Sequence, residues 1–194
     1  NLSNYLNSKF IFNLSLVAEN FYFNKDYKKS RKILKNFDKN QDFYYWYRLK
    51  KEAQIITKTR SSNEALNYIT SKFDRIEKPN NKFIFDIANF YKNSKKYEKA
   101  IKYYSSIIDK LVDDNDVKAD LLYRRGGCYE RLKDYDRADK DLQASLKINP
   151  NDAYVLNYLA YSWLERDFKI DEAIVMLEKA YEQKNNDPYI IDSI

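Results

Sequence analysis

The sequence predicts an all-α solenoid of about five helix pairs, followed by the start of a sixth. The first observation behind this prediction is a repeat: apolar residues that open a helical pattern recur at steps of 35, 35, 38 and 34 residues. The second observation is the spacing within each repeat. After each starting residue, apolar residues follow at intervals of three, four and seven, as on one face of an amphipathic helix. Two such stretches and a polar turn make each unit, which is typical of helical repeat arrays. The starting residues are Leu14, Leu49, Ile84, Leu122 and Leu156.

The five units are expected to form a single solenoid over residues 1–194. Their predicted bounds are 11–45, 46–80, 81–118, 119–152 and 153–187, and residues 188–194 begin a further unit. The step of 38 predicts a longer loop or a lengthened helix around residues 110–118. Because half a helix cannot cover its own apolar face, we expect the solenoid to continue beyond both ends of this chain.

Small residues recur at two positions of each unit, where two helices would have to approach closely. Bulky residues follow the first small position, and apolar residues follow the second. The first small set is Ala18, Ala53, Ala88, Gly126 and Ala160, followed by Phe21, Ile56, Tyr91, Tyr129 and Trp163. The second small set is Ser30, Ala65, Ala100, Ala138 and Ala173, followed by Leu34, Ile69, Tyr104, Leu142 and Leu177.

The chain has only two glycines, and they are adjacent within a predicted helix, at Gly126 and Gly127. Each costs a helix about 1 kcal/mol relative to alanine. Gly126 occupies the close-approach position, so packing explains it. Gly127 has no such reason, because its counterparts are Glu19, Gln54, Asn89 and Tyr161. Two interpretations stay open: a recess that receives a ligand group, or a defect that the neighbouring helices tolerate.

The composition argues against an enzyme. The absence of histidine removes His-based triads, His metal sites and the commonest general base. Cys128 is the single cysteine, which excludes an internal disulfide, and it is expected to be a small core residue. We therefore expect no catalytic residue, no metal and no cofactor. No run of eighteen apolar residues occurs, so we expect a soluble chain, in either the cytoplasm or the periplasm.

The fourth unit, "LLYRRGGCYERLKDYDRADKDLQASLKINPND", carries Gly126, Tyr129, Ala138 and Pro150 at characteristic positions. With these residues the chain resembles the tetratricopeptide repeat family over essentially its whole length. The last two units resemble repeats of large bacterial members. The resemblance implies a right-handed superhelix of helix pairs. The resemblance is weakest in the second unit, since Glu52 and Lys72 replace apolar or small residues. In the fourth unit, Arg125 stands at a usually apolar position, and we expect it to form an ion pair with Asp139 or Asp141.

The resemblance also implies a non-catalytic scaffold that binds a protein or peptide segment in a concave groove lined by the first helices. Tyrosine is favoured in such surfaces because it combines a large contact area with a hydroxyl group. The family's carboxylate clamp is not expected, because Asp86 and Asp120 stand where cationic or amide donors are needed. The groove stripe carried onto this chain comprises Tyr47, Lys50, Lys51, Gln54, Phe85, Asp86, Asn89, Tyr123, Arg124, Gly127, Tyr154, Asn157, Tyr158 and Tyr161.

The charge is uneven along the chain, which raises a different class of partner. Residues 1–100 contain 21 Lys and Arg against 10 Asp and Glu, whereas residues 101–194 contain 14 against 19. A basic, aromatic half is a feature of nucleic-acid binding. Several of these lysines lie on second helices, which form the outer face, so we do not expect a nucleic acid partner. An RNA-binding helical-repeat protein and a structural spacer within a larger chain remain the alternatives, and the oligomeric state is left open.

Overall fold

A computed structural model describes residues 11–37, 42–113 and 115–193, and the regular elements within these ranges are all α-helices. The all-α fold that the sequence predicts is therefore confirmed. The chain divides into two compact units, residues 1–83 and residues 84–194, which are described separately.

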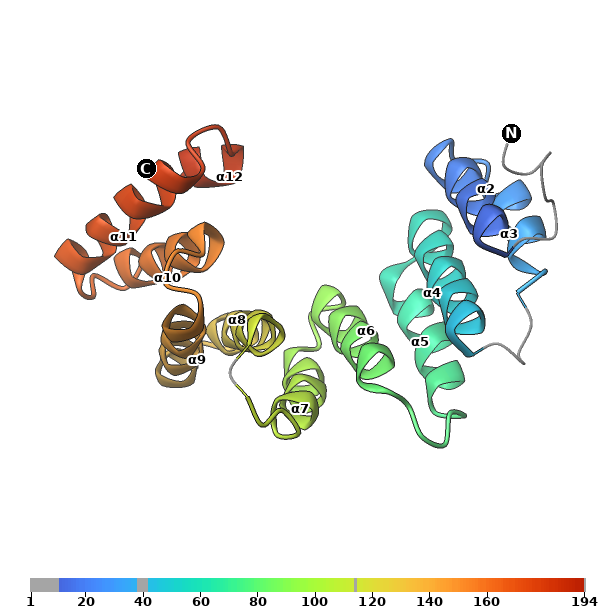
Figure 1. Ribbon diagram of the computed structural model, residues 1–194, viewed down its shortest axis with the longest axis horizontal. Coiled ribbons are helices and arrows are strands. Elements are labelled where there is room, and N and C mark those ends of the chain that lie inside the picture. Colours follow the sequence, from blue (N-terminus) through green and yellow to red (C-terminus); the bar gives the residue numbers. More distant parts are fainter. Residues whose placement is uncertain (1–10, 38–41, 114, 194) are drawn as a thin grey trace. The chain divides into compact units, whose positions relative to one another are not determined.

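The first unit contains two helix pairs. Helix α2 (Ile11–Phe23) packs on α3 (Tyr27–Leu34), and α4 (Asp42–Thr59) packs on α5 (Ser62–Phe73), as Figure 1 shows. The boundary between the units falls within α6 (Asn81–Asn93).

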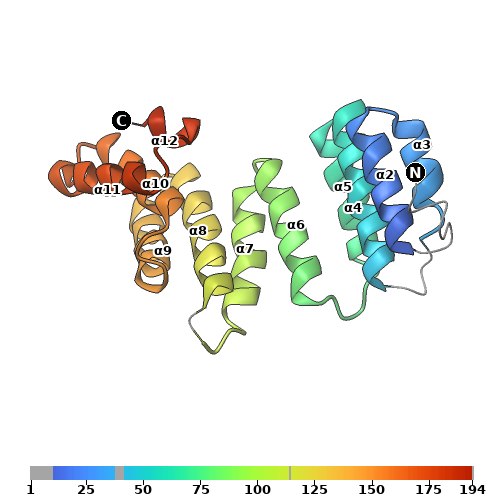
Figure 2. The same cartoon turned by 45° about the horizontal axis from the view of Figure 1, so that its top comes forward.

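The second unit contains the greater part of α6 and the helices that follow it. These are α7 (Tyr97–Ile108), α8 (Asp116–Arg131), α9 (Tyr135–Ile148), α10 (Ala153–Leu164), α11 (Ile170–Gln183) and the short α12 (Pro188–Ile191). Helix α8 packs on α9 and on α7, and α10 packs on α11, so successive helices lie side by side (Figure 2).

The predicted bounds of the units stay a prediction, and the helices begin at or near them. Helices α6, α10 and α12 begin at residues 81, 153 and 188. The predicted starts at 46 and 119 fall inside helices, because α4 already begins at Asp42 and α8 at Asp116. In α8 the physical reason is a cap: the Asn115 side chain accepts a hydrogen bond from the backbone N–H of Lys118 at 3.0 Å, which starts the helix early.

The recurring small residues lie in the core, as the repeat predicts. Ala18, Ala53, Ala88 and Ala160 are fully buried, and so are the second-helix residues Ser30, Ala100, Ala138 and Ala173. Gly126 belongs to the same set. A Cβ atom added there would lie 3.0 Å from Leu142 Cγ and 3.3 Å from the carbonyl oxygen of Ala138. The close approach of α8 and α9 therefore requires glycine or a local adjustment.

Among the described residues, the turns that join the two helices of four pairs each have a residue in the left-handed region at the same place in the repeat. These residues are Lys25, Lys95, Lys133 and Asp167, with φ between 51° and 61°. The last of these turns has a second such residue, Lys169, with φ of 46°. After each of the four shared residues, the next backbone N–H donates to a carbonyl five residues earlier, as from Asp134 to Tyr129 at 3.0 Å. This bond closes the end of the first helix and reverses the chain. A side chain in this region costs about 1 kcal/mol or more, so the sharp reversal is maintained despite local strain.

Candidate peptide-binding site

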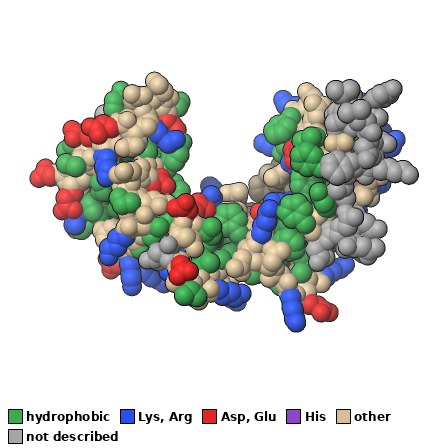
Figure 3. Space-filling view, in the orientation of Figure 1, with side chains coloured by type: hydrophobic (Ala, Val, Ile, Leu, Met, Phe, Trp, Pro, Cys, Tyr) green, Lys and Arg blue, Asp and Glu red, His purple; other side chains and the backbone are tan. Residues whose placement is uncertain are grey.

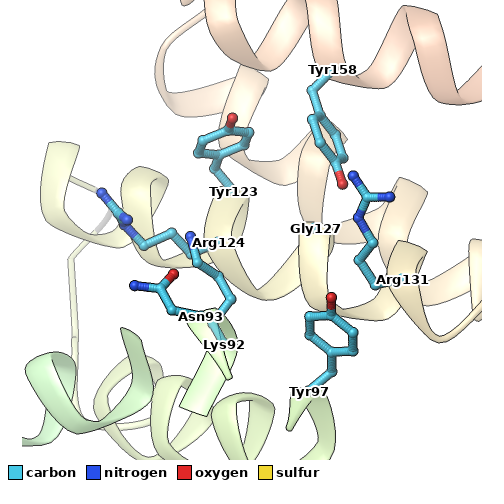
Figure 4. Close-up of a pocket in the computed structure, with 8 residues that line it drawn as sticks. All are labelled: Lys92, Asn93, Tyr97, Tyr123, Arg124, Gly127, Arg131 and Tyr158. Carbon is cyan, nitrogen blue, oxygen red and sulfur yellow. The ribbon is translucent and has the colours of Figure 1, made fainter. Parts of the chain in front are cut away.

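The second unit contains a cavity of about 270 Å³ between α6, α7, α8 and α10. We call it the cationic pocket, because three of its lining residues are Lys or Arg and none is Asp or Glu. Figure 4 shows Arg124 and Arg131 on either side of Gly127, with the hydroxyl groups of Tyr97 and Tyr158 directed toward Arg131. Its lining residues are Lys92, Asn93, Tyr97, Tyr123, Arg124, Gly127, Arg131 and Tyr158.

The absence of a side chain at Gly127 leaves the middle of this pocket open. A Cβ atom added there would meet only the ring and hydroxyl of Tyr158, at 3.5–3.9 Å, which is ordinary contact. Gly126 lies one residue away and faces α9 at much shorter distances. Tyr123 and Tyr158 form the aromatic wall, with ring centroids 5.8 Å apart and an edge-to-face angle of 87°. The two adjacent glycines thus face opposite surroundings, one the core and the other the pocket.

Lys92 is a half-buried cation of the cationic pocket. Burial, and next the positive charge of Arg124, lower the pKa of Lys92 below its ordinary value. No carboxylate of the described residues lies within ion-pair distance of its Nζ. Arg124 differs, because its Nε donates to Asp120 at 2.8 Å and its guanidinium lies 5.1 Å from the centre of the Phe85 ring. An anion in the pocket would therefore favour the charged form of Lys92.

A second cavity, of about 290 Å³, adjoins the first and shares Arg131 and Tyr158 with it. We call it the acidic pocket, because Glu130 and Glu165 line it. The Tyr158 hydroxyl donates to Glu130 Oε2 at 2.8 Å; burial, and next this bond, raise the pKa of Tyr158. Its lining residues are Glu130, Arg131, Tyr158, Tyr161, Ser162, Glu165, Tyr189 and Ser193.

Five of the fourteen residues of the predicted stripe line these two pockets. They are Tyr123, Arg124, Gly127, Tyr158 and Tyr161. The four remaining lining residues of the cationic pocket, which the predicted stripe does not include, are Lys92, Asn93, Tyr97 and Arg131. Lys92 follows Asn89 by three residues and Arg131 follows Gly127 by four, so extending the stripe by one helical turn would have found both. Tyr97 lies on a second helix, where the stripe does not reach.

In the first unit, two predicted stripe residues are held by other residues of the protein. The buried Lys51 donates from Nζ to Glu19 Oε2 at 2.8 Å and lies 4.3 Å from the centre of the Tyr22 ring. The Tyr47 hydroxyl donates to Glu19 Oε1, also at 2.8 Å. Both groups therefore stabilise the packing of α4 on α2. Lys50 is half-buried and Gln54 is exposed.

Most of the other predicted residues in the second unit also have structural partners. Asn89 Oδ1 accepts from the Tyr104 hydroxyl at 2.8 Å, and Phe85 lies beneath Arg124. Tyr154 donates to Asp187 Oδ2 at 2.7 Å. Asn157 is only 1% exposed, so it cannot contact a ligand without rearrangement. Asp86 is half-buried.

The described ranges contain no group of three His, Cys, Asp or Glu residues that could hold a metal ion. None of their helices combines the length and the apolar character that crossing a bilayer needs.

Comparisons with known proteins point to one family. Models of the tetratricopeptide repeat match residues 82–109 and residues 119–152. A TPR repeat-containing protein of Pseudomonas aeruginosa is 34% identical over 74 residues. That match covers 38% of this chain but only 12% of the relative's length.

Solved structures share the fold at low identity. The Cut9–Hcn1 complex of the APC/C aligns with a TM-score of 0.69 and 16% identity, over 98% of this chain and 36% of that one. YrrB, described as a TPR protein with an unusual peptide-binding site, aligns at 0.63 and 12%, over 98% and 94%.

The tetratricopeptide repeat is typical of protein–protein interaction scaffolds, and proteins built from it are generally non-catalytic. Two separate repeats match the family models, and the curated relative is assigned to the same family. Residues 82–109 and 119–152 thus match tetratricopeptide repeats, and these matches support the assignment of the chain to that family.

Proposed function

We propose that this chain is a non-catalytic scaffold that binds an extended segment of a partner protein, and that the segment occupies the cationic and acidic pockets of the second unit. The observation that carries the proposal is the opening at Gly127. A helix interior disfavours glycine. Gly127 nevertheless lies in one and adds no side chain to a cavity that Tyr97, Tyr123 and Tyr158 line.

The size and lining of the cavity favour a peptide over a small molecule. At about 270 Å³ it lies just below the range of roughly 300–1,000 Å³ that is usual for small-molecule sites. It also adjoins the acidic pocket, with which it shares the lining residues Arg131 and Tyr158. Such a pair of shallow, aromatic-walled pockets suits successive side chains of one extended segment. The peptide-binding site named for YrrB, which has the same fold, gives the proposal a precedent in another protein.

The test is a selection of displayed random twelve-residue peptides on the 194-residue chain, followed by fluorescence anisotropy of the selected peptides. Gly127→Tyr would fill the cationic pocket, and we expect it to weaken binding at least tenfold. The matched control is Gln143→Tyr, which adds the same side chain at an exposed position of α9 outside both pockets. Selected peptides that bind the Gly127→Tyr variant as tightly as the parent chain would refute the proposed site.

A further inference from the structure

The two adjoining pockets carry opposite charge, so a partner would meet a cationic pocket and an acidic pocket next to each other. The cationic pocket contains Lys92, Arg124 and Arg131, and the acidic pocket contains Glu130 and Glu165. Arg131 and Tyr158 line both pockets, so the two pockets adjoin. A segment that lies across Tyr158 would therefore meet a positive and then a negative environment within a short distance.

The internal ion pairs leave one charged group in each pocket without an ion-pair partner among the described residues. Arg124 forms an ion pair with Asp120. Glu130 lies 3.5 Å from Arg131, which is longer than a normal hydrogen bond, and it also accepts from Tyr158. Lys92 on one side and Glu165 on the other have no ion-pair partner among the described residues. A half-buried ammonium without a counter-ion gains most from an incoming carboxylate, because it has already lost part of its hydration.

The charge around the pockets argues against an extended polyanion such as RNA. Residues 84–194 contain 18 Lys and Arg against 21 Asp and Glu. Figure 3 shows acidic and basic side chains interspersed over α10 and α11, without a continuous basic band. Nucleic-acid affinity depends on many phosphate contacts, and a single small cationic pocket supplies few. A single carboxylate on an otherwise mixed peptide matches the pocket better.

We infer that the partner segment carries an acidic residue that occupies the cationic pocket beside Lys92 and, a few residues away, a basic residue that lies beside Glu165. This inference rests on the proposed function, since it names the chemistry of the segment that those pockets would bind. The charge order would also fix the direction in which the segment lies, because the reversed segment would place like charges together.

The selected twelve-residue peptides test the inference directly. We expect them to share an Asp or Glu and a Lys or Arg at a constant separation. Replacing the shared acidic residue by Gln should weaken binding to the parent chain about tenfold, and should have little effect on a Lys92→Gln variant, because the interaction is already absent there. Lys140→Gln, at an exposed position of α9, is the matched control and should behave as the parent. Glu165→Gln should act in the same way on the basic residue of the peptide.

The outcomes separate this inference from the proposed function. Peptides that depend on Gly127 but share no acidic residue would overturn the inference and leave the proposed function standing. A selection that yields no peptide would overturn both. A fluorescein-labelled twelve-nucleotide uridine oligomer provides the remaining arm: binding that is lost in Lys92→Gln and kept in Lys140→Gln would overturn the inference in favour of RNA.

Discussion

Arg125 and Asp141 form a two-point ion pair between α8 and α9, with Nε and Nη2 donating to the two carboxylate oxygens at 2.7 and 2.8 Å. The Arg125 Nη1 also donates to Ser105 Oγ at 2.9 Å, which ties α7 to the same contact. The hydrogen bond with Asp141 raises the pKa of Arg125. This pair explains an arginine at a position that is usually apolar in the family: its charge is neutralised at once by the second helix of its own repeat.

The first prediction concerns this pair. Asp141→Ala leaves the largely buried guanidinium without its carboxylate, and we expect the free energy of unfolding to fall by about 3 kcal/mol. Replacing both residues, as Arg125→Met with Asp141→Leu, should recover most of that loss, since no charge is then buried alone. Urea unfolding followed by circular dichroism measures both. The exposed pair Lys169–Glu172 is the control, and Glu172→Ala should cost less than about 1 kcal/mol.

The second prediction concerns the strained turn between α8 and α9. Lys133 has φ of 60°, which glycine adopts without steric cost, so Lys133→Gly should raise the free energy of unfolding by about 1 kcal/mol. The same substitution at Lys140, in the middle of α9, should lower it by about 1 kcal/mol through helix propensity. Thermal melting of the two variants against the parent should therefore shift in opposite directions. If both variants were destabilised equally, the turn would not be strained as its geometry indicates.

The third prediction concerns alkaline pH. Burial raises the pKa of the Cys128 thiol to about 11 from 9.0, and that of Tyr123 to about 12 from 10.0. Both groups keep their protons to a higher pH in the folded chain than in the unfolded chain. The stability that this difference contributes is complete below pH 9, and is lost as pH rises from 9 through 12. Urea midpoints should change little between pH 8 and 9 and decline from pH 9 to pH 11, and Cys128→Ala should make the decline between pH 9 and 11 shallower.

The periodicity was sufficient to predict the core but not the partners of charged groups. Small residues such as Ala88 and Ala138 are buried where the repeat places them, because a period in sequence reports a period in packing. The sequence analysis placed Lys51 on the groove stripe, whereas the structure buries it. The ion pair of Lys51 with Glu19 could not be predicted from the sequence, because it joins residues 32 apart and depends on how α2 and α4 pack. Tyr97 was missed for a related reason, since its helix is not one of those assigned to the groove.

The last prediction concerns the two glycines, whose surroundings differ although they are neighbours. Gly126→Tyr would force a ring between α8 and α9, where even a Cβ lies 3.0 Å from Leu142, and overpacking of this kind costs about 1–3 kcal/mol or more. Gly127→Tyr places the same ring in the cationic pocket, so we expect the melting temperature to stay at or above that of the parent, helped by helix propensity. Gly127→Ala should be stabilised by up to about 1 kcal/mol. Circular dichroism melts of the three variants decide the matter: a Gly127→Tyr protein as unstable as Gly126→Tyr would mean that Gly127 is required for packing and that the cavity beside it is incidental.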